Sequence, residues 1–313
     1  MNEPSTGLLP VLRRRLLVAV LTVFGVATVV FALVRLLPGD PAETMLARAG
    51  AGPEAVAALR SELGLDRPLL VQYADWLGHA ARGDLGRSLL NNRPVGEMIA
   101  EQWRSTAILA GVAFVFAVLL GVGLGVTSAA YPRRWPDRVA SVVAVGGVAV
   151  PVYWSGLLLI WLLSVRLGWL PPATGTPASA LLPGFVLGYA AAGPIARMTR
   201  ASLQEILGQP YITAALAKGL SQRQLMWRHA ARSAAGPVLT IAALQLGFLL
   251  GGAVVTESVF NRPGLGRLLV DGILWRDLPL VQGVALVLAV TYVILNLGVD
   301  LLVSILDPRV GWR

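Results

Sequence analysis

The sequence has no cysteine, only two histidines and a single lysine. Without cysteine the chain forms no disulfide and offers no thiolate for catalysis or metal binding. His79 and His229 are far apart and neither has a partner at the spacing of metal ligands, so we predict no metal site. Lys218 follows Ala217 and precedes Gly219, whereas a nucleotide-binding P-loop needs glycine before its lysine and serine or threonine after it. We therefore predict that this chain is not an enzyme and holds no cofactor of its own.

Charged residues are also scarce, at 14% of the chain against about 25% in ordinary soluble domains. Hydrophobic residues make up 56% and the mean hydropathy is +0.68, which is more apolar surface than a soluble domain of this size can bury. The formal net charge of +9 comes mainly from arginines at the ends of apolar runs, where anionic lipid headgroups favour them. No basic face is interleaved with aromatic residues, so we expect membrane lipid and no nucleic acid as the partner of these cations.

Six uncharged runs reach the roughly 20 residues that a helix needs to cross the hydrocarbon core of a membrane. Each must be helical, because lipid cannot satisfy backbone N–H and C=O groups. The fourth run begins with turn-forming residues, so its span is expected at about 180–198. The predicted fold class is therefore all-α, a polytopic membrane protein with six transmembrane helices. The runs are Leu16–Val34, Ser105–Pro132, Val139–Val165, Leu167–Ala196, Ser233–Thr256 and Leu278–Val299.

The cations at the ends of these runs predict the orientation of the bundle. Fourteen of the 26 lysines and arginines lie on one side: before span 1, between spans 2 and 3, between spans 4 and 5, and after span 6. Cytoplasmic loops carry such an excess, so both termini are expected in the cytoplasm. Segments 1–15 and 307–313 then flank a transmembrane domain over 16–306. The first apolar run is longer than the core of a signal peptide, so we expect it to be retained as a helix.

Two external loops are expected to be structured. In the loop 37–104, Pro53 suits the first position of a helix and Gly64 its end. The segment 67–83 of the same loop carries an apolar stripe at helical spacing. A second stripe in the loop 260–278 predicts a short helix lying at the membrane interface. The members of this second stripe are Leu265, Leu268, Leu269 and Ile273.

The cytoplasmic loop between spans 4 and 5 contains a polar, basic stretch with helix signals of its own. Pro210 suits a first helical position, and the residues YITAALAK supply about two turns that end at Gly219. Ser221 and Gln224 have the spacing of a capping box that starts a second helix. Pro237 is expected to open the next span. The stretch therefore predicts a short helix, a tight turn and a second helix that merges into span 5.

Few ionisable side chains fall within the spans, and such groups are candidates for function. Asp300 lies in the last third of span 6, and Glu257 ends span 5 on the external side. For both, a structural pairing and a place on a transport pathway stay open. The glycines and prolines of spans 3 to 5 suit either close helix packing or a broken helix that lines a pathway. The candidate pathway or gate residues are Tyr153, Gln245, Glu257, Asn296 and Asp300.

The stretch between spans 4 and 5 resembles the cytoplasmic "EAA" loop of permease subunits in binding-protein-dependent ABC importers. Ala214, Ala215 and Gly219 carry the resemblance. It departs at Thr213, where the family's best-known form has Glu, and at Pro237, where the proline falls later. Further segments, in order along the chain, resemble the first permease subunit of the dipeptide, oligopeptide and nickel branch. They are RRLLVAVLTVFGVATVVFALVRLLPGDPA, LGLDRPLLVQYADWL, RGDLGRSL, VPVYWSGLLLIWLLSVRLGWLP, AKGLS, ESVFNRPGLGRLLVDGILWRDLPLVQG and DLLVSILDPR.

The resemblance implies a type I ABC importer permease-like bundle in the bacterial inner membrane. Such a subunit forms half of a translocation pathway for dipeptides or short oligopeptides. The implied partners are a second homologous permease subunit, two ATPase subunits that bind ATP and Mg, and an extracytoplasmic solute-binding protein. A coupling helix in the loop 199–236 is implied to dock into the ATPase. The implied coupling residues are Thr213, Ala214, Ala215, Leu216, Lys218, Gly219 and Ser221.

Other functions are compatible with the residues. An ion-coupled secondary carrier would transport without an ATPase, although a proton-driven carrier usually has several buried carboxylates or a histidine relay. A membrane scaffold would bind partners without any flux. Within the importer family, nickel chelates, glutathione-like thiols and other small solutes stay open beside peptides.

Overall fold

The structure is a computed structural model in which most of the chain is helical. The cytoplasmic tail 307–313, the turn-rich residues 170–176 and much of the external segment 37–51 lie outside the described residues, as does Arg223 of the cytoplasmic loop. The described residues are 8–36, 42, 52–62, 64–169, 177–221 and 224–306.

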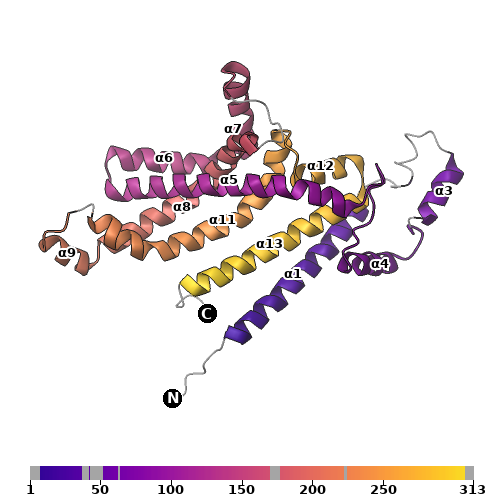
Figure 1. The fold of residues 1–313 in the computed structure, drawn as a ribbon, viewed down its shortest axis with the longest axis horizontal. Coiled ribbons are helices and arrows are strands. Elements are labelled where there is room, and N and C mark those ends of the chain that lie inside the picture. The colour runs from indigo at the N-terminus through magenta and orange to yellow at the C-terminus, as the bar shows by residue number, and fades with distance from the viewer. Residues whose placement is uncertain are drawn as a thin grey trace, which may run out of the picture. The chain divides into compact units, whose positions relative to one another are not determined.

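Figure 1 shows the helices in chain order from indigo to yellow. Two segments are π-helices and one is a 3-10 helix, and the others are α-helices. The α-helices are α1 (Leu8–Leu36), α3 (Pro53–Glu62), α4 (Leu69–Ala81), α5 (Val95–Ala130), α6 (Trp135–Ala149), α7 (Val152–Leu159), α8 (Leu181–Leu207), α9 (Pro210–Ala217), α11 (Ala231–Val259), α12 (Leu265–Trp275) and α13 (Leu278–Leu306). The π-helices are η1 (Ile160–Arg166) and η3 (Leu225–Ala230), and the 3-10 helix is η2 (Pro177–Ala180).

Five helices among the described residues are long and apolar enough to cross a membrane. A sixth span results when α6 and the α7–η1 segment are counted as one bent pair. The all-helical fold with five to six candidate spans agrees with the prediction from the sequence. The five are α1 over Arg13–Leu33, α5, α8, α11 and α13 over Leu278–Leu301.

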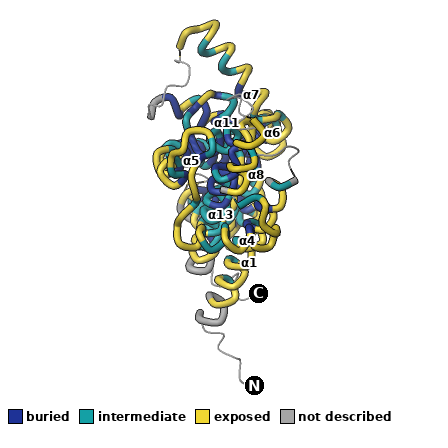
Figure 2. Tube along the Cα trace, turned by 90° about the vertical axis from the view of Figure 1, so that its right-hand side faces the viewer, coloured by how far each residue is buried: buried dark blue, intermediate teal, exposed yellow. Residues whose placement is uncertain are grey.

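The chain forms two compact units, and α5 and α13 each run from one unit into the other. Unit 1 comprises Met1–Ser105 and Pro263–Ile294, and unit 2 comprises Thr106–Arg262 and Leu295–Arg313. Figure 2 shows exposed residues along much of α1, where Leu17 and Leu33 are 60% and 58% exposed. Apolar side chains in such positions are expected where lipid is the solvent.

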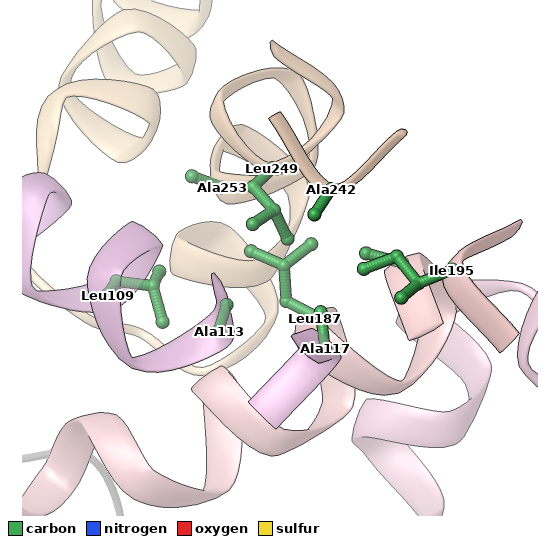
Figure 3. Packing of buried hydrophobic residues seen from close by; sticks show 9 residues of the cluster. Leu109, Ala113, Ala117, Leu187, Ile195, Ala242, Leu249 and Ala253 are labelled. Atoms are coloured by element: carbon green, nitrogen blue, oxygen red, sulfur yellow. The ribbon is translucent and has the colours of Figure 1, made fainter. Parts of the chain in front are cut away.

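Helix α8 forms the centre of unit 2, because it contacts α6, α7 and α11 and also packs against α5. Its residue Leu187 is fully buried between small and apolar side chains of α5 and α11 (Figure 3). Residues of three helices that are separate in sequence therefore share one core. The cluster comprises Leu109, Ala113, Ala117, Leu187, Ala191, Ile195, Ala242, Leu249 and Ala253.

The glycines of α8 bring its backbone against its neighbours. A Cβ atom on Gly188 would lie 2.4 Å from the carbonyl oxygen of Ala113, and one on Gly193 would lie 2.5 Å from that of Ala144. Backbone atoms cannot move aside as a flexible side chain can. At these two positions the structure supports the packing interpretation of the span glycines, since small residues let helices approach closely.

The predicted third span, Val139–Val165, is not one straight helix. Its two halves are bent by 105° at a break between Ala149 and Val152. Val150 is extended, with φ −92° and ψ 124°, and Pro151 follows it. A proline disfavours helical geometry in the residue before it and donates no backbone hydrogen bond, so the helix ends there. The bend before Pro151 therefore supports the broken-helix alternative for this span.

The prediction that Pro237 opens the fifth span is also wrong, because α11 begins at Ala231 and Pro237 lies inside it. The residues before the proline are held by packing, since Ala230 and Ala234 belong to a buried cluster with Leu203 of α8. Membrane-type helices tolerate an internal proline when neighbouring helices support the segment.

The predicted helices of the external loops are present in unit 1. Helix α3 begins at Pro53, and Gly64 beyond its end has φ +64°. In α4, Tyr73 packs edge-to-face on Phe31 of α1, with ring centroids 5.2 Å apart. Helix α12 packs its Leu265 into a core with α5 and α13 residues, and Leu268 and Leu269 pack against that core, whereas Ile273 is 44% exposed. Three members of the apolar stripe therefore face protein, and the place of this helix at the membrane interface stays a prediction. That core is formed by Val95, Ile99, Leu265, Leu280 and Val284.

Candidate coupling site

Helix α9 is a short helix with defined ends, and it lies in the loop that was predicted to be cytoplasmic. Pro210 is its first residue, where the missing N–H of proline costs no helical hydrogen bond. At the other end, the Gly219 N–H donates to the Leu216 carbonyl at 2.9 Å, and the Leu220 N–H donates to the Ala215 carbonyl at 3.3 Å. These two bonds form a Schellman motif, with Gly219 in the left-handed region at φ +85°. The predicted helix and its glycine stop are confirmed.

Helix α9 presents most of its surface to solvent. Ile212 is 2% exposed, and α9 contacts η3, which follows it in the chain. Tyr211 and Leu216 are about half exposed. The predicted coupling residues Thr213, Ala214, Leu216, Lys218, Gly219 and Ser221 are exposed, and Ala215 is half-buried. The result is a knob of small side chains around one exposed leucine, fastened at one buried point.

The predicted capping box follows the turn. The Ser221 N–H donates to Oε1 of Gln224 at 3.0 Å, and the Gln224 N–H donates to Oγ of Ser221 at 3.4 Å. This reciprocal pair starts the next helix, whose first turns are the π-helix η3. Leu225 and Met226 of η3 are buried. The turn after α9 therefore leads directly into η3, which packs in a core with residues of α5, α8 and α11.

Asp137 joins three helices of unit 2, and no pattern in the sequence singled it out. Its carboxylate accepts hydrogen bonds from the Ser128 hydroxyl near the end of α5 and from the Arg133 N–H at 2.8 Å. Arg200 of α8 donates to it at 3.0 Å and completes an ion pair. Asp137 is 5% exposed at the start of α6. The pair connects the ends of α5 and α6 to the part of α8 that leads into α9.

A second buried polar network lies at the C-terminal end of α11 and in the loop that follows it. Glu257 is fully buried and accepts a hydrogen bond from the Thr106 hydroxyl at 2.7 Å. Arg262 is 1% exposed, donates its N–H to the Glu257 carbonyl at 2.8 Å, and donates from Nη1 to Ser179 Oγ at 2.8 Å. Burial lowers the pKa of Arg262 and the charge of Glu257 raises it. Glu257 is thus a structural anchor for the loop after α11.

The other four candidate pathway residues lie on three helices, α7, α11 and α13. Tyr153 is 53% exposed on α7, and Gln245 is partly buried on α11. Gln245 and Glu257 are 12 residues apart in one helix, which separates them by about 18 Å along its axis. Asn296 and Asp300 are four residues apart on α13 and share a helix face, with Asp300 exposed. The structure therefore gathers the coupling residues into one site but not the five pathway candidates.

Several membrane-type helices around a glycine-packed central helix, with an exposed short helix in one loop, define a polytopic membrane protein. Two family models match nearly the whole chain. "Binding-protein-dependent transport system inner membrane component" matches residues 121–312, and "Binding-prot-dependent transport system membrane comp, N-term" matches residues 8–110. The chain belongs to this family of binding-protein-dependent transport permeases, and it is an inner-membrane permease of an ABC importer.

Relatives of known name match this chain over almost its full length. The chain is 42% identical to the glutathione transport system permease protein GsiC of Salmonella choleraesuis (strain SC-B67), over 96% of this chain and 98% of that protein. It is 41% identical to the GsiC protein of Escherichia coli (strain K12), with the same coverage. Members of this family are the membrane components of their transport systems and are not themselves enzymes.

Solved structures share the fold at lower identity. A structure of the MetNI methionine ABC transporter in an inward-facing conformation superposes with a TM-score of 0.56 at 20% identity, over 67% of this chain and 96% of the matched chain. A crystal structure of an amino acid ABC transporter with histidines gives a TM-score of 0.51 at 20% identity, over 68% of this chain and 94% of its own. These likenesses support the type I importer permease fold.

Proposed function

We propose that this chain forms half of a pathway for short peptides of about the size of glutathione, driven by separate ATPase subunits through α9. The observation that carries the proposal is the exposed, glycine-terminated knob of α9. A helix of two turns is too short to be stable alone, so its defined ends and single buried anchor indicate a surface kept in shape for a partner.

The partners proposed are a second homologous permease subunit, two ATPase subunits that hold ATP and Mg, and an extracytoplasmic solute-binding protein. The sequence of this chain lacks a P-loop, so the nucleotide has to be bound elsewhere in the complex. Two related permease subunits would complete a pathway of which each supplies one side. The relatives named for glutathione transport support a peptide cargo.

The contacts of unit 2 suggest how movement of α9 would reach the spans. Movement of α9 would act on η3, which it contacts, and η3 continues directly into α11. On the other side, α9 follows α8, which is tied by Arg200 to Asp137. Closure of the ATPases around ATP would thus tilt α8 and α11 together. For transport to be coupled, ATP and the loaded binding protein must both favour the same outward state.

Reconstitution tests the proposal. The purified complex in proteoliposomes should take up a labelled short peptide only when the vesicles contain ATP, the ATPase subunits are present and the binding protein is outside. Each omission serves as a control. Uptake that persisted without ATP under a proton gradient would favour the ion-coupled carrier and overturn the proposal. Stable assembly with no flux of any solute would favour the scaffold.

Cargo is tested in the same vesicles by competition. Unlabelled glutathione, dipeptides, oligopeptides and a nickel chelate are added in turn against the labelled peptide. We expect the short peptides and glutathione to compete. Competition by the nickel chelate alone would retain the importer mechanism and overturn the peptide assignment.

A further inference from the structure

A cavity lined by apolar and polar side chains lies within unit 1, away from the coupling site. It has a volume of about 270 Å3, is open on one side, and is lined by the C-terminal end of α1, the connection between α3 and α4, α4 itself and the start of α13. This is near the lower end of the range for small-molecule sites, so it suits a compact group. Its polar lining comprises Arg35, Arg67, Gln72, Asp75, Trp76 and Gln282.

Three N–H donors at this cavity are buried without a hydrogen-bond partner within the described part of the chain. They are Nε of Arg35, Nε1 of Trp76 and Nε2 of Gln282. Gln282 is only 5% exposed. Guanidinium and indole groups can only donate, so these atoms require an acceptor. Buried polar groups in native proteins are nearly always hydrogen-bonded, which makes three such donors around one cavity a sign of a missing acceptor.

Gln72 adds an acceptor to the same cavity. Its Nε2 donates to the carbonyls of Leu65 at 3.1 Å and Arg67 at 2.7 Å, which fixes the orientation of the amide. Its Oε1 then has no partner among the described residues, and Gln72 is only 9% exposed. The cavity therefore also needs one hydrogen-bond donor from its occupant.

The charge of the lining favours an anion. At the rim, Arg67 pairs with Asp75 at 3.2 Å, so these two charges offset each other. Arg35 sits with its Cζ 5.3 Å from the centroid of the Phe31 ring. Burial lowers the pKa of Arg35, with no opposing contribution from a carboxylate of the described residues. Arginine still stays protonated at neutral pH, so a half-buried cation faces the cavity without a counter-ion in this part of the chain.

We infer that this cavity binds a zwitterion that carries an oxyanion and an ammonium group. The oxyanion would accept from Arg35, Trp76 and Gln282, and the ammonium would donate to Gln72 Oε1 and approach Asp75. A single water needs only about 10–15 Å3, so one ordered water leaves most of the cavity unfilled. The same chemistry occurs in the phosphoethanolamine headgroup of a lipid and in the free ends of a short peptide. The site is independent of α9 and of the proposed coupling.

Two soluble probes test the site in the intact transporter complex, purified in detergent without its binding protein. Glycerophosphoethanolamine carries the lipid headgroup chemistry, and dialanine carries that of a peptide. Isothermal titration should detect binding of at least one. Trp76→Phe removes one donor and keeps a ring, and Gln282→Leu removes another, so each should weaken binding about tenfold.

Trp103→Phe is the matched control, because Trp103 is 40% exposed on α5 and does not line the cavity. It should leave binding unchanged. Arg35→Lys keeps the charge, and it replaces either cavity variant if that variant fails to fold. Binding of glycerophosphoethanolamine alone identifies a lipid site, and binding of dialanine alone identifies a solute site. Binding of neither probe, or binding that Trp76→Phe and Gln282→Leu leave unchanged, would overturn the inference and leave water as the occupant.

Discussion

Gly219 shows how one residue shapes the proposed docking surface. With φ +85° it adopts a conformation that costs other L-residues about 1–2 kcal/mol. Among the described residues beyond its chain neighbours, no atom lies within 4 Å of the position that its Cβ would occupy, so the local requirement is backbone conformation and not space. The Schellman bonds to Leu216 and Ala215 depend on this conformation.

Gly219→Trp is therefore expected to uncouple transport from ATP hydrolysis. The strain loosens the end of α9, and the indole adds bulk to the exposed knob, so peptide uptake per ATP hydrolysed should fall by roughly five- to thirtyfold from strain alone. Uptake and ATP hydrolysis are measured together in proteoliposomes.

Gly219→Asn is the matched control, since asparagine tolerates the left-handed region, and it should retain more coupling than the tryptophan variant. Gly208→Ala tests the glycine at the end of α8, which has φ −80° and should tolerate alanine. Normal uptake by Gly219→Trp would contradict the coupling assignment.

Glu257 is expected to stabilise the loop after α11, and not the knob formed by α9. Glu257→Gln would replace its buried carboxylate, which Thr106 contacts, and remove the negative charge near Arg262. Disturbing a buried hydrogen-bonded charge costs about 1–3 kcal/mol, so the melting temperature of the purified protein should fall.

Thermal unfolding in detergent checks this expectation. Glu205→Gln is the control, because Glu205 is exposed on α8 and its loss should leave the melting temperature nearly unchanged. Equal shifts for both variants would show that the Glu257 network does not stabilise the fold.

At the scale of elements, α8 is the helix on which unit 2 depends. It is more buried within the protein than the other four candidate spans that consist of one helix, and its glycines let α5 and α6 approach its backbone. The bend between α6 and α7 and the π-helices are further local departures from straight α-helix. Packing between helices is the main source of their order here, since lipid gives no hydrophobic force between them.

Gly188→Ala should destabilise this core. The added Cβ would lie 2.4 Å from the Ala113 carbonyl oxygen, and forcing an extra carbon into a packed core costs about 1–3 kcal/mol. The yield of folded protein after detergent extraction and its melting temperature report the effect.

Gly251→Ala in α11 is the matched control, because nothing lies within 4 Å of its added Cβ. Alanine is a better helix former than glycine by about 1 kcal/mol, so this variant should be unchanged or slightly more stable. A similar loss in both variants would argue against close packing at Gly188.

At the scale of the whole molecule, the proposed function depends on linkage between two partner sites. ATP is proposed to act through α9 on the cytoplasmic side, and the binding protein is proposed to act on the external side. If both favour one outward state, each must raise the affinity of the complex for the other by the same factor.

The linkage is measurable at equilibrium with a non-hydrolysable ATP analogue. We expect the analogue to tighten binding of the cargo-loaded binding protein, and the loaded binding protein to tighten binding of the analogue equally. The unloaded binding protein is the control and should have a smaller effect. No change in either affinity would contradict coupling through a shared outward state.

The sequence alone determined the features that depend on neighbours along the chain. Long uncharged runs require helices in lipid, Pro210 and Gly219 set the ends of α9, and Ser221 with Gln224 forms the capping box. These signals act over at most a few turns, so local chemistry suffices to predict them. The resemblance in the cytoplasmic loop likewise led to the family that the comparisons established.

Only the tertiary structure decided which distant residues meet. It paired Asp137 with Arg200, buried Glu257 beside Thr106, and placed Gln282 and Trp76 around one cavity. It also packed Leu265, Leu268 and Leu269 of α12 against residues of α5 and α13. Each of these contacts joins helices separated by tens or hundreds of residues, and its free energy depends on desolvation and geometry that no local pattern encodes.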